Sequence, residues 1–261
     1  MRMGMRIITH FGQAHTDDFI SVAVLLAKFP DAEVHRVSKV QEVHNDDIVV
    51  DIGERFDNEQ FFDHHQDPNL PSALILVLKR FFPEIDIENI EEVQWISDRD
   101  TLGIIKAQEK WGAKLLPFGD PIAETVLKMF SERDIIKPGD FLHTFMIEFG
   151  KVFIKSLKES VENLQKVGTA EVFSVKGLKV VRLNDNIPVR FVKKVHSDVA
   201  IVIQPNSRIP GAVSLVRVDD HPKVDFRRII NKIPAHFVHA NGFLAVVDSE
   251  HVKDALEFAI F

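Results

Sequence analysis

Three adjacent residues, Asp63, His64 and His65, form an Asp-His-His triplet directly after the apolar pair Phe61 and Phe62. Each of the three side chains can bind a divalent cation or hold a ligand through a hydrogen bond. Burying them together is costly unless a metal ion or a hydrogen-bond network satisfies their polar atoms. An isolated triplet is more often a solvated turn, so it indicates a metal site only if other segments supply further ligands.

Three other segments supply such ligands. His10, His15 and Asp17 lie between a short apolar run and a helix-like stretch, Asp51 ends a buried-strand pattern, and Asp100 follows a further apolar step. Open α/β sheets bind their ligands at the carboxyl ends of the strands. If the sheet is parallel, four segments therefore bring four histidines and several aspartates to one edge.

The order of these ligands resembles that of the DHH phosphoesterase superfamily, which includes RecJ-like exonucleases, short-oligonucleotide phosphodiesterases and family II inorganic pyrophosphatases. Within it the sequence is most similar to the melanocyte-proliferating-gene family of metal-dependent hydrolases, described as exonuclease-like. The opening element of that family, T-H-x-G-x-x-H-x-D, matches Thr9 to Asp17, and its D-H-H-Q motif matches Asp63 to Gln66. A weaker similarity to its H-x-x-G-F signature falls on His239 to Phe243. The resemblance is strong in the first hundred residues and loose after about residue 180.

The resemblance implies two divalent ions that share one bridging carboxylate, for which we choose Asp51. The ligands implied for one ion are His10, His15 and Asp51, and those for the other are Asp17, Asp51, His64 and Asp100. His65 would lie near the transferring phosphorus, and Asp63 would orient a ligand, so the catalytic residues are Asp51, Asp63 and His65. Asp98 is the alternative to Asp100; we favour Asp100 because an Asp-Thr pair after an apolar step is similar to the fourth motif of the superfamily.

The ligand types bear on the identity of the metal. Many DHH enzymes have an aspartate at the position of His15, whereas the more similar family shares the histidine. An additional imidazole makes the site softer and less negative, which favours Mn²⁺, Co²⁺ or Zn²⁺ over Mg²⁺. We therefore expect two Mn²⁺ ions, which would activate a water molecule and stabilise charge on the phosphoryl oxygens.

The C-terminal part of the chain supplies candidates for substrate binding. Many DHH phosphoesterases carry a G-G-G-H element there, and this sequence lacks it. His239, Asn241 and Gly242 look like a reduced version, because a glycine lets a backbone N–H approach a phosphate and a histidine can donate a hydrogen bond. A simple turn before a strand explains these residues equally well. Arg208 and Arg217 could add positive charge at the substrate cleft, although most arginines of this kind are surface groups.

The order of the expected elements predicts an α/β fold with a mainly parallel sheet flanked by helices, followed by a smaller α+β lobe. The first part has the expected strands Arg6–Thr9, Glu33–Val37, Ile48–Ile52 and Gln60–Phe62, and the expected helices Asp18–Phe29, Ser72–Phe82, Ile87–Asp98 and Pro121–Ser131. Helical spacing of apolar residues from Gly139 to Val167, with four phenylalanines, predicts one long helix or a bent pair whose phenylalanines pack in the core.

The second lobe is expected to hold a hairpin that turns at Lys176 and Gly177, three more strands and two helical stretches. These are the hairpin Glu171–Leu183, the strands Val199–Ile203, Ala212–Val218 and Phe243–Val247, and the helical stretches Asp225–Asn231 and Ser249–Ala259. The predicted domains are residues 1–137 for the metal-binding catalytic domain, 138–168 for a helical connector and 169–261 for the substrate-binding lobe. We expect the second lobe to select the substrate.

Composition limits the class of protein. The 261 residues are 45% hydrophobic, which is ordinary for a globular fold, and the absence of cysteine excludes disulfides and thiolate ligands. No apolar stretch approaches a membrane span or a signal peptide, so a cytoplasmic location is the default expectation. The net charge of −7 argues against a protein that coats long duplex nucleic acid.

These observations predict a metal-dependent phosphoesterase of the exonuclease-like kind. Its expected partners are a small phosphorylated substrate or short single-stranded RNA or DNA, and a homodimer is compatible with the sequence. An inorganic pyrophosphatase is the alternative enzyme, although no basic motif for holding a small, highly charged anion is evident. A non-catalytic metal-binding regulatory protein is the third reading, and the retained ligand set counts against it.

Overall fold

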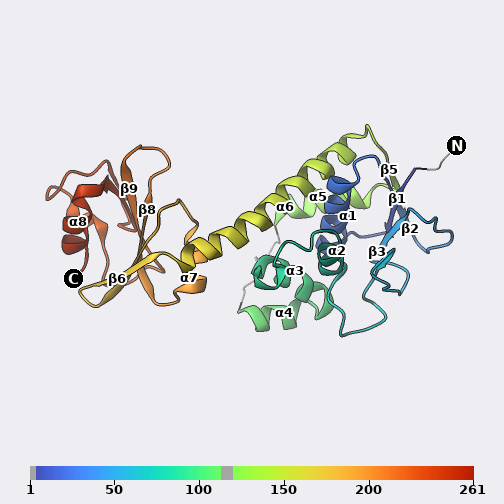
Figure 1. The fold of residues 1–261 in the computed structure, drawn as a ribbon, viewed down its shortest axis with the longest axis horizontal. Helices are drawn as coiled ribbons and strands as arrows, with labels where there is room; N and C mark the ends of the chain where they lie inside the picture. The colour runs from blue at the N-terminus through green and yellow to red at the C-terminus, as the bar shows by residue number, and fades with distance from the viewer. Residues whose placement is uncertain (1–3, 113–119) are drawn as a thin grey trace. The chain divides into compact units, whose positions relative to one another are not determined.

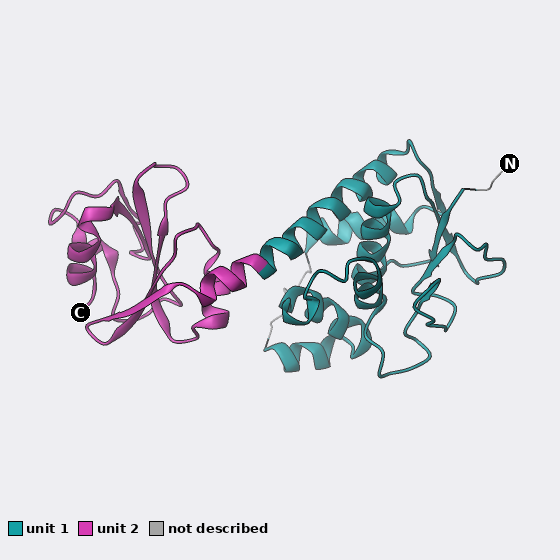
Figure 2. Ribbon diagram, viewed as in Figure 1, with its two compact units in different colours: residues 1–161 teal, residues 162–261 magenta. Residues whose placement is uncertain are grey.

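The computed structural model describes residues 4–112 and 120–261. The chain divides into two compact units, residues 1–161 and residues 162–261 (Figure 2). The border lies within one long helix, α6 (Phe141–Gly168), which belongs in part to each unit. The division of the chain into a catalytic domain, a connector and a substrate-binding lobe stays a prediction.

The first unit is built on a five-stranded sheet in the order β4-β3-β1-β2-β5 (Figure 1). Its strands are β1 (Arg6–His10), β2 (Glu33–Val37), β3 (Ile48–Val50), β4 (Phe61–Phe62) and β5 (Ile135–Ile136). Strands β1 to β4 are parallel, and β5 pairs antiparallel with β2 at the edge. The predicted α/β class with a mainly parallel sheet is therefore confirmed.

Helices pack around this sheet. They are α1 (Thr16–Lys28), α2 (Ala73–Phe81), α3 (Glu91–Thr101), α4 (Ile104–Trp111), α5 (Pro121–Ser131) and α6, with a 3₁₀ turn η1 (Ile87–Asn89) before α3. The helix predicted over Ile87–Asp98 is thus a 3₁₀ turn and a separate helix that continues to Thr101. The apolar spacing did not predict α4 or β5.

Close packing between α6 and α1 fixes the helix that carries two of the acidic residues. A Cβ atom at Gly150 of α6 would lie 2.1 Å from the carbonyl oxygen of Ala23 in α1, so only glycine allows this approach. Phe149 packs edge-on against Phe19 of α1, with ring centroids 5.2 Å apart. The prediction that the α6 phenylalanines pack in the core is wrong for Phe141, which is 74% exposed.

The second unit is a six-stranded sheet in the order β10-β11-β9-β8-β7-β6, in which only the β7–β8 pair is parallel. Its strands are β6 (Glu171–Val175), β7 (Leu178–Arg182), β8 (Val199–Pro205), β9 (Ala212–Arg217), β10 (Phe237–Val238) and β11 (Leu244–Asp248), and its helices are α7 (Val189–Val195) and α8 (Val252–Ala259), with 3₁₀ turns η2 (Phe226–Ile229) and η3 (Ser249–His251). The stretch predicted as helical over Asp225–Asn231 is only the 3₁₀ turn η2.

The hairpin between β6 and β7 turns at Lys176 and Gly177, as predicted. Both residues have positive φ angles, 48° and 79°, which is the backbone that a tight two-residue hairpin requires. Apolar clusters lie on both faces of the second sheet, one beneath α8 and one beneath α7. Among the described residues no helix is long and apolar enough to cross a membrane.

Candidate metal centre

The parallel sheet of the first unit places the ends of three strands at one edge. His10 is the last residue of β1, Asp51 follows β3 directly, and Asp63 follows β4 directly. The chain runs from β1 to β2 on one side and to β3 on the other, so β1 and β3 form a switch point of the sheet. Such switch points are where open α/β sheets bind ligands. The N-terminus of α1 carries His15 and Asp17 into the same region.

Asp51 occupies the middle of this region. Its φ angle of 58° is in the left-handed range, which non-glycine residues rarely adopt outside special sites. Its backbone N–H donates to the Phe62 carbonyl oxygen at 3.1 Å, which holds the turn in place. The side chain is buried, with Oδ2 3.5 Å from Nε2 of His10 and Oδ1 3.4 Å from Nδ1 of His64.

Asp100 enters the same region from the last turn of α3. Its Oδ2 lies 2.9 Å from Nε2 of His64, and its Oδ1 lies 3.7 Å from Nδ1 of His15. Asp98 turns away, because its Oδ2 accepts a hydrogen bond from Nε1 of Trp111 at 2.6 Å and pairs with Nζ of Lys110 at 2.7 Å. The structure therefore brings Asp100, and not Asp98, to the cluster.

Three groups of side chains in the described residues offer atoms within 4.8 Å of one another that could hold a cation. They are His10, His15 and Asp51; Asp17, Asp51, His64 and Asp100; and Asp51, Asp63, His64 and His65. Asp51 belongs to all three. The first two groups have the same members as the two ligand sets expected from the sequence, although their binding of metal stays a proposal.

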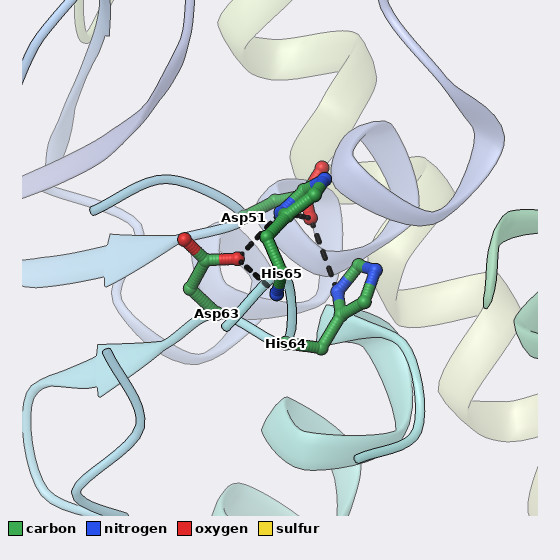
Figure 3. A group of neighbouring side chains, drawn as sticks. All are labelled: Asp51, Asp63, His64 and His65. Atoms are coloured by element: carbon green, nitrogen blue, oxygen red, sulfur yellow. Dashed lines mark hydrogen bonds and ion pairs between the residues drawn. The ribbon is translucent and has the colours of Figure 1, made fainter. Parts of the chain in front are cut away.

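In the third group, the imidazole of His65 is paired through one of its nitrogens with Asp63 (Figure 3). Oδ1 of Asp63 accepts hydrogen bonds from the backbone N–H of His65 at 3.2 Å and from its Nδ1 at 2.7 Å. The other Asp63 oxygen accepts from the Glu54 backbone N–H at 2.6 Å. Because Nδ1 of His65 is engaged, its Nε2 is the nitrogen that is free to meet a ligand, and the side chain is 56% exposed.

Several buried carboxylates lie close together in the cluster, and their mutual repulsion and burial shift their pKa values. Burial and the charges of Asp17 and Asp100 raise the pKa of Asp51 to about 10. Burial and the charges of Asp100 and Asp18 raise the pKa of Asp17 well above its ordinary value. Burial also acts to raise the pKa of Asp100, but the interaction with His64 and the nearby imidazoles lowers it overall. Without a cation the cluster therefore retains protons at neutral pH.

The buried polar atoms of the cluster fit a cation. Of the described residues, the following cluster atoms are buried and have no hydrogen-bond partner: His10 Nε2, both oxygens of Asp17, Asp18 Oδ2, both oxygens of Asp51 and His64 Nδ1. Folded proteins leave few such atoms, because each costs about 1–3 kcal/mol. All seven are oxygens or imidazole nitrogens, which are the donors that divalent cations accept from proteins without thiolates.

Asp18 is a residue of this cluster that the motif comparison missed. It is fully buried, its Oδ1 accepts from the His15 backbone N–H at 2.8 Å, and its Oδ2 lies 3.0 Å from Nε2 of His10 without the alignment of a hydrogen bond. The proximity of this carboxylate raises the pKa of His10. The sequence does contain a signal, since an acidic residue three positions after a helix-capping residue is a known N-terminal pattern.

The C-terminal candidates lie in the second unit, where His239, Asn241 and Gly242 form the turn between β10 and β11. The backbone N–H of Gly242 donates to the His239 carbonyl oxygen at 2.8 Å, and the N–H of Asn241 donates to Nδ1 of His239 at 3.1 Å. Both N–H groups are thus used within the turn. The expectation that this turn contacts a phosphate of the substrate stays a prediction.

The two arginines do not form one patch. Arg217 ends β9, and its guanidinium donates to the Val224 carbonyl oxygen at 2.9 Å and to Oδ1 of Asp220 at 2.6 Å. Arg208 is exposed in the loop that precedes β9. Since the whole of β9 separates them, only Arg217 lies beside the His239 turn, where its Nη2 is 3.4 Å from the Asn241 carbonyl oxygen.

Comparison with known proteins supports the resemblance over the segment that carries most of the cluster. Residues 6–70 match the family model MYG1_exonuc, described as an uncharacterised protein family, UPF0160. A match of 67 residues is 39% identical to a MYG1 protein of Saccharomyces cerevisiae and covers 25% of this chain and 20% of that protein. A match of 64 residues is 39% identical to the MYG1 exonuclease of Homo sapiens, covering 23% of this chain and 17% of that protein.

The chain therefore resembles the MYG1 family, which is the melanocyte-proliferating-gene family identified from its motifs. The match spans about a fifth of the length of the curated relatives. A solved chain from Methanococcus jannaschii, described as a family II inorganic pyrophosphatase, aligns over 97% of this chain and 98% of its own length with 17% identity and a TM-score of 0.22. A likeness at this score bears on neither the fold nor the function.

Proposed function

We propose that the chain is a two-metal phosphoesterase that hydrolyses phosphodiester or phosphomonoester bonds of nucleotides or short oligonucleotides. The observation that carries this proposal is the buried Asp51 carboxylate, which is common to all three groups of prospective ligands and has both oxygens without a hydrogen-bond partner. A carboxylate so placed is suited to bridging two cations. The family model matches residues 6–70, which contain Asp51 and the Asp-His-His triplet, and the exonuclease name of the human relative supports the same class of reaction.

The proposal assigns one shared ligand and two separate sets. His10, His15 and Asp51 would hold one ion, and Asp17, Asp51, His64 and Asp100 would hold the other. Two divalent ions bound in this way supply an activated water and neutralise charge on the phosphoryl oxygens. The mixture of imidazole and carboxylate donors favours Mn²⁺, with Co²⁺, Zn²⁺ and Mg²⁺ as alternatives.

The remaining residues of the triplet act on the substrate side. Asp63 holds Nδ1 of His65 in its protonated form and fixes the orientation of the ring. The side chain of His65 is 56% exposed. In the imidazolium form its Nε2 also carries a hydrogen, which could be donated in a hydrogen bond to a phosphoryl oxygen or transferred to the leaving oxygen. Asp63 is itself held by the Glu54 backbone N–H, so the pair is a preorganised unit.

A metal-dependent activity screen tests the proposal. Metal-free protein is loaded with Mn²⁺, Co²⁺, Zn²⁺ or Mg²⁺ and assayed on bis-p-nitrophenyl phosphate, dinucleotides, cyclic dinucleotides, short RNA, short DNA and pyrophosphate. We expect two bound ions per chain and hydrolysis of a nucleotide phosphoester that chelation removes and Mn²⁺ restores. Binding of no metal would overturn the proposal, and cleavage of pyrophosphate alone would replace it with the alternative enzyme.

A further inference from the structure

A pocket of about 310 Å³ opens beside the candidate metal centre, within the first unit. Three prospective ligands, His15, Asp17 and Asp100, form part of its wall. Its volume is at the lower end of the roughly 300–1,000 Å³ usual for small-molecule sites, so it suits one nucleotide-sized group rather than a length of chain. None of the residues expected from the sequence to bind substrate lies here.

Arg99 lines this pocket and is a cation without an ion-pair partner in the described part of the chain. Its nearest charged neighbours in sequence are occupied, Asp98 by Lys110 and Asp100 by His64. The only interaction of its guanidinium among the described residues is with the ring of Trp95, whose centroid is 5.8 Å from Cζ. A guanidinium in this condition keeps its fork of N–H donors for an anion such as a phosphate.

Another part of the pocket wall is apolar. Ile96 of α3, Ile104 of α4 and Leu127 of α5 contribute it, and Ile104 is 40% exposed. Among the described residues this apolar surface is left partly in contact with water, and a ligand that covers it would gain hydrophobic stabilisation. A flat, weakly polar group such as a nucleobase would bury this surface.

We propose that the pocket binds a single nucleotide unit of the substrate. Arg99 holds a phosphate next to the metal centre, and Ile96, Ile104 and Leu127 contact the base. The inference rests on the proposed phosphoesterase function and narrows it, since it places recognition of a nucleoside phosphate in the first unit. Arg99 is in this sense a binding residue that acts on the phosphate directly.

Equilibrium binding to the Mn²⁺-loaded chain of 261 residues tests the proposal, with AMP and inorganic phosphate as probes in isothermal titration calorimetry. Arg99→Ala should weaken both probes about 10- to 100-fold, because a charge-assisted hydrogen bond contributes roughly 1.5–3 kcal/mol and each 1.4 kcal/mol is tenfold. Ile104→Ser should weaken AMP several-fold and leave phosphate unchanged. Arg99→Lys should recover part of the affinity for both probes.

Arg80→Ala is the matched control. Arg80 lies on α2 with its guanidinium 5.8 Å from the ring of Phe81, the same stacking as Arg99 on Trp95, but it is outside the pocket. The Arg80→Ala variant should bind AMP and phosphate with the affinities of the wild-type protein. Unchanged binding in Arg99→Ala, an equal loss in Arg80→Ala, or a wild-type protein that binds neither probe would each overturn the proposal.

The same variants separate failure of the pocket from failure of the proposed function. Metal content is measured in each, and hydrolysis of a 5′-phosphorylated dinucleotide is followed in parallel. A wild-type protein that hydrolyses nothing but binds AMP in an Arg99-dependent manner would refute the phosphoesterase and keep the pocket. A wild-type protein that hydrolyses the dinucleotide with KM and AMP affinity unaltered by Arg99→Ala would refute the pocket and keep the phosphoesterase.

Discussion

The two units of the chain use charge in opposite ways. Residues 1–161 contain 28 Asp and Glu against 18 Lys and Arg, whereas residues 162–261 contain 11 against 14. The net charges are therefore −10 and +3, and the total of −7 hides the difference. Much of the acidity that matters in the first unit is buried, with several carboxylates and imidazoles gathered around Asp51.

The units also differ in how they satisfy buried polar atoms. In the first unit, seven unsatisfied atoms converge on one cluster; in the described part of the second, the unsatisfied side-chain atoms are two separate nitrogens, on His196 and Arg217. The prominent polar residues of the second unit are engaged within their own turns and strands. A cluster of buried polar atoms without hydrogen-bond partners indicates a ligand-binding site. A single buried atom of this kind does not.

The largest expected effect comes from removing the Asp51 carboxylate, on which the clustered polar atoms of the first unit converge. We expect Asp51→Asn to lower kcat by more than about 10³-fold, because a neutral amide is a poor bridge and both ion sites depend on it. The metal-free variant should stay folded and gain thermal stability, since it no longer buries an ionisable group. Steady-state kinetics and thermal unfolding after chelation measure the two effects. Near wild-type turnover would show that the two-metal mechanism is wrong.

Asp100 and Asp98 offer a paired test of which carboxylate serves the centre. Asp100→Asn should reduce bound Mn²⁺ from two ions to one per chain and lower kcat about 10²- to 10³-fold. Asp98→Asn, two positions away on the same helix, should keep both ions, because Asp98 faces Trp111 and Lys110. Metal content by mass spectrometry decides between them, and the reverse pattern would exchange their assignments.

His65 separates chemistry from metal binding. His65→Ala should lower kcat about 10²-fold, the usual contribution of a general acid, while bound metal stays near two ions per chain. Asp63→Asn should produce a smaller loss, since it disturbs the orientation of the ring and leaves Nε2 in place. Parallel measurement of kcat and metal content is the test. Loss of one ion in His65→Ala would make this residue a ligand instead.

The pH dependence of stability follows from the raised pKa of Asp51. A carboxyl whose pKa is higher in the folded than in the unfolded chain stabilises the fold below its unfolded value, and this contribution is lost as the pH rises to the folded value. For Asp51 the window runs from 3.8 to about 10. The Tm of the metal-free protein should therefore fall by roughly 5 °C between pH 5 and pH 9. Mn²⁺ should reverse the fall, and Asp51→Asn should flatten it.

The smallest effect is expected in the second unit. His239→Ala should raise KM about two- to threefold for dinucleotides and short RNA and leave bis-p-nitrophenyl phosphate unaffected, if this unit helps to select the substrate. The change is small because the turn at His239 is held by its own backbone hydrogen bonds. An equal change in KM for every substrate would show that the second unit does not select the substrate.

The residue types and the order of the prospective ligands could be predicted from the sequence alone. Short apolar strands that end in His10, Asp51 and Asp63 imply a shared edge, because parallel strands run in one direction and their carboxyl ends meet. The bounds of β2 and α5 also follow from local signals, an apolar alternation for one and a proline at the helix start for the other. These inferences need only neighbouring residues, so no tertiary contact enters them.

Other features depended on tertiary structure. Asp98 and Asp100 are two positions apart on a helix that turns about 100° per residue, so they point to opposite sides, and only the packing of α3 decides which side meets the cluster. The contact of Asp18 with His10 and the unpaired state of Arg99 likewise depend on which elements lie next to them. The sequence determined which chemical groups this protein has at the edge of its sheet. The phase of each helix against that sheet decided which of them meet, because side-chain direction is set by rotation about the helix axis and not by residue type.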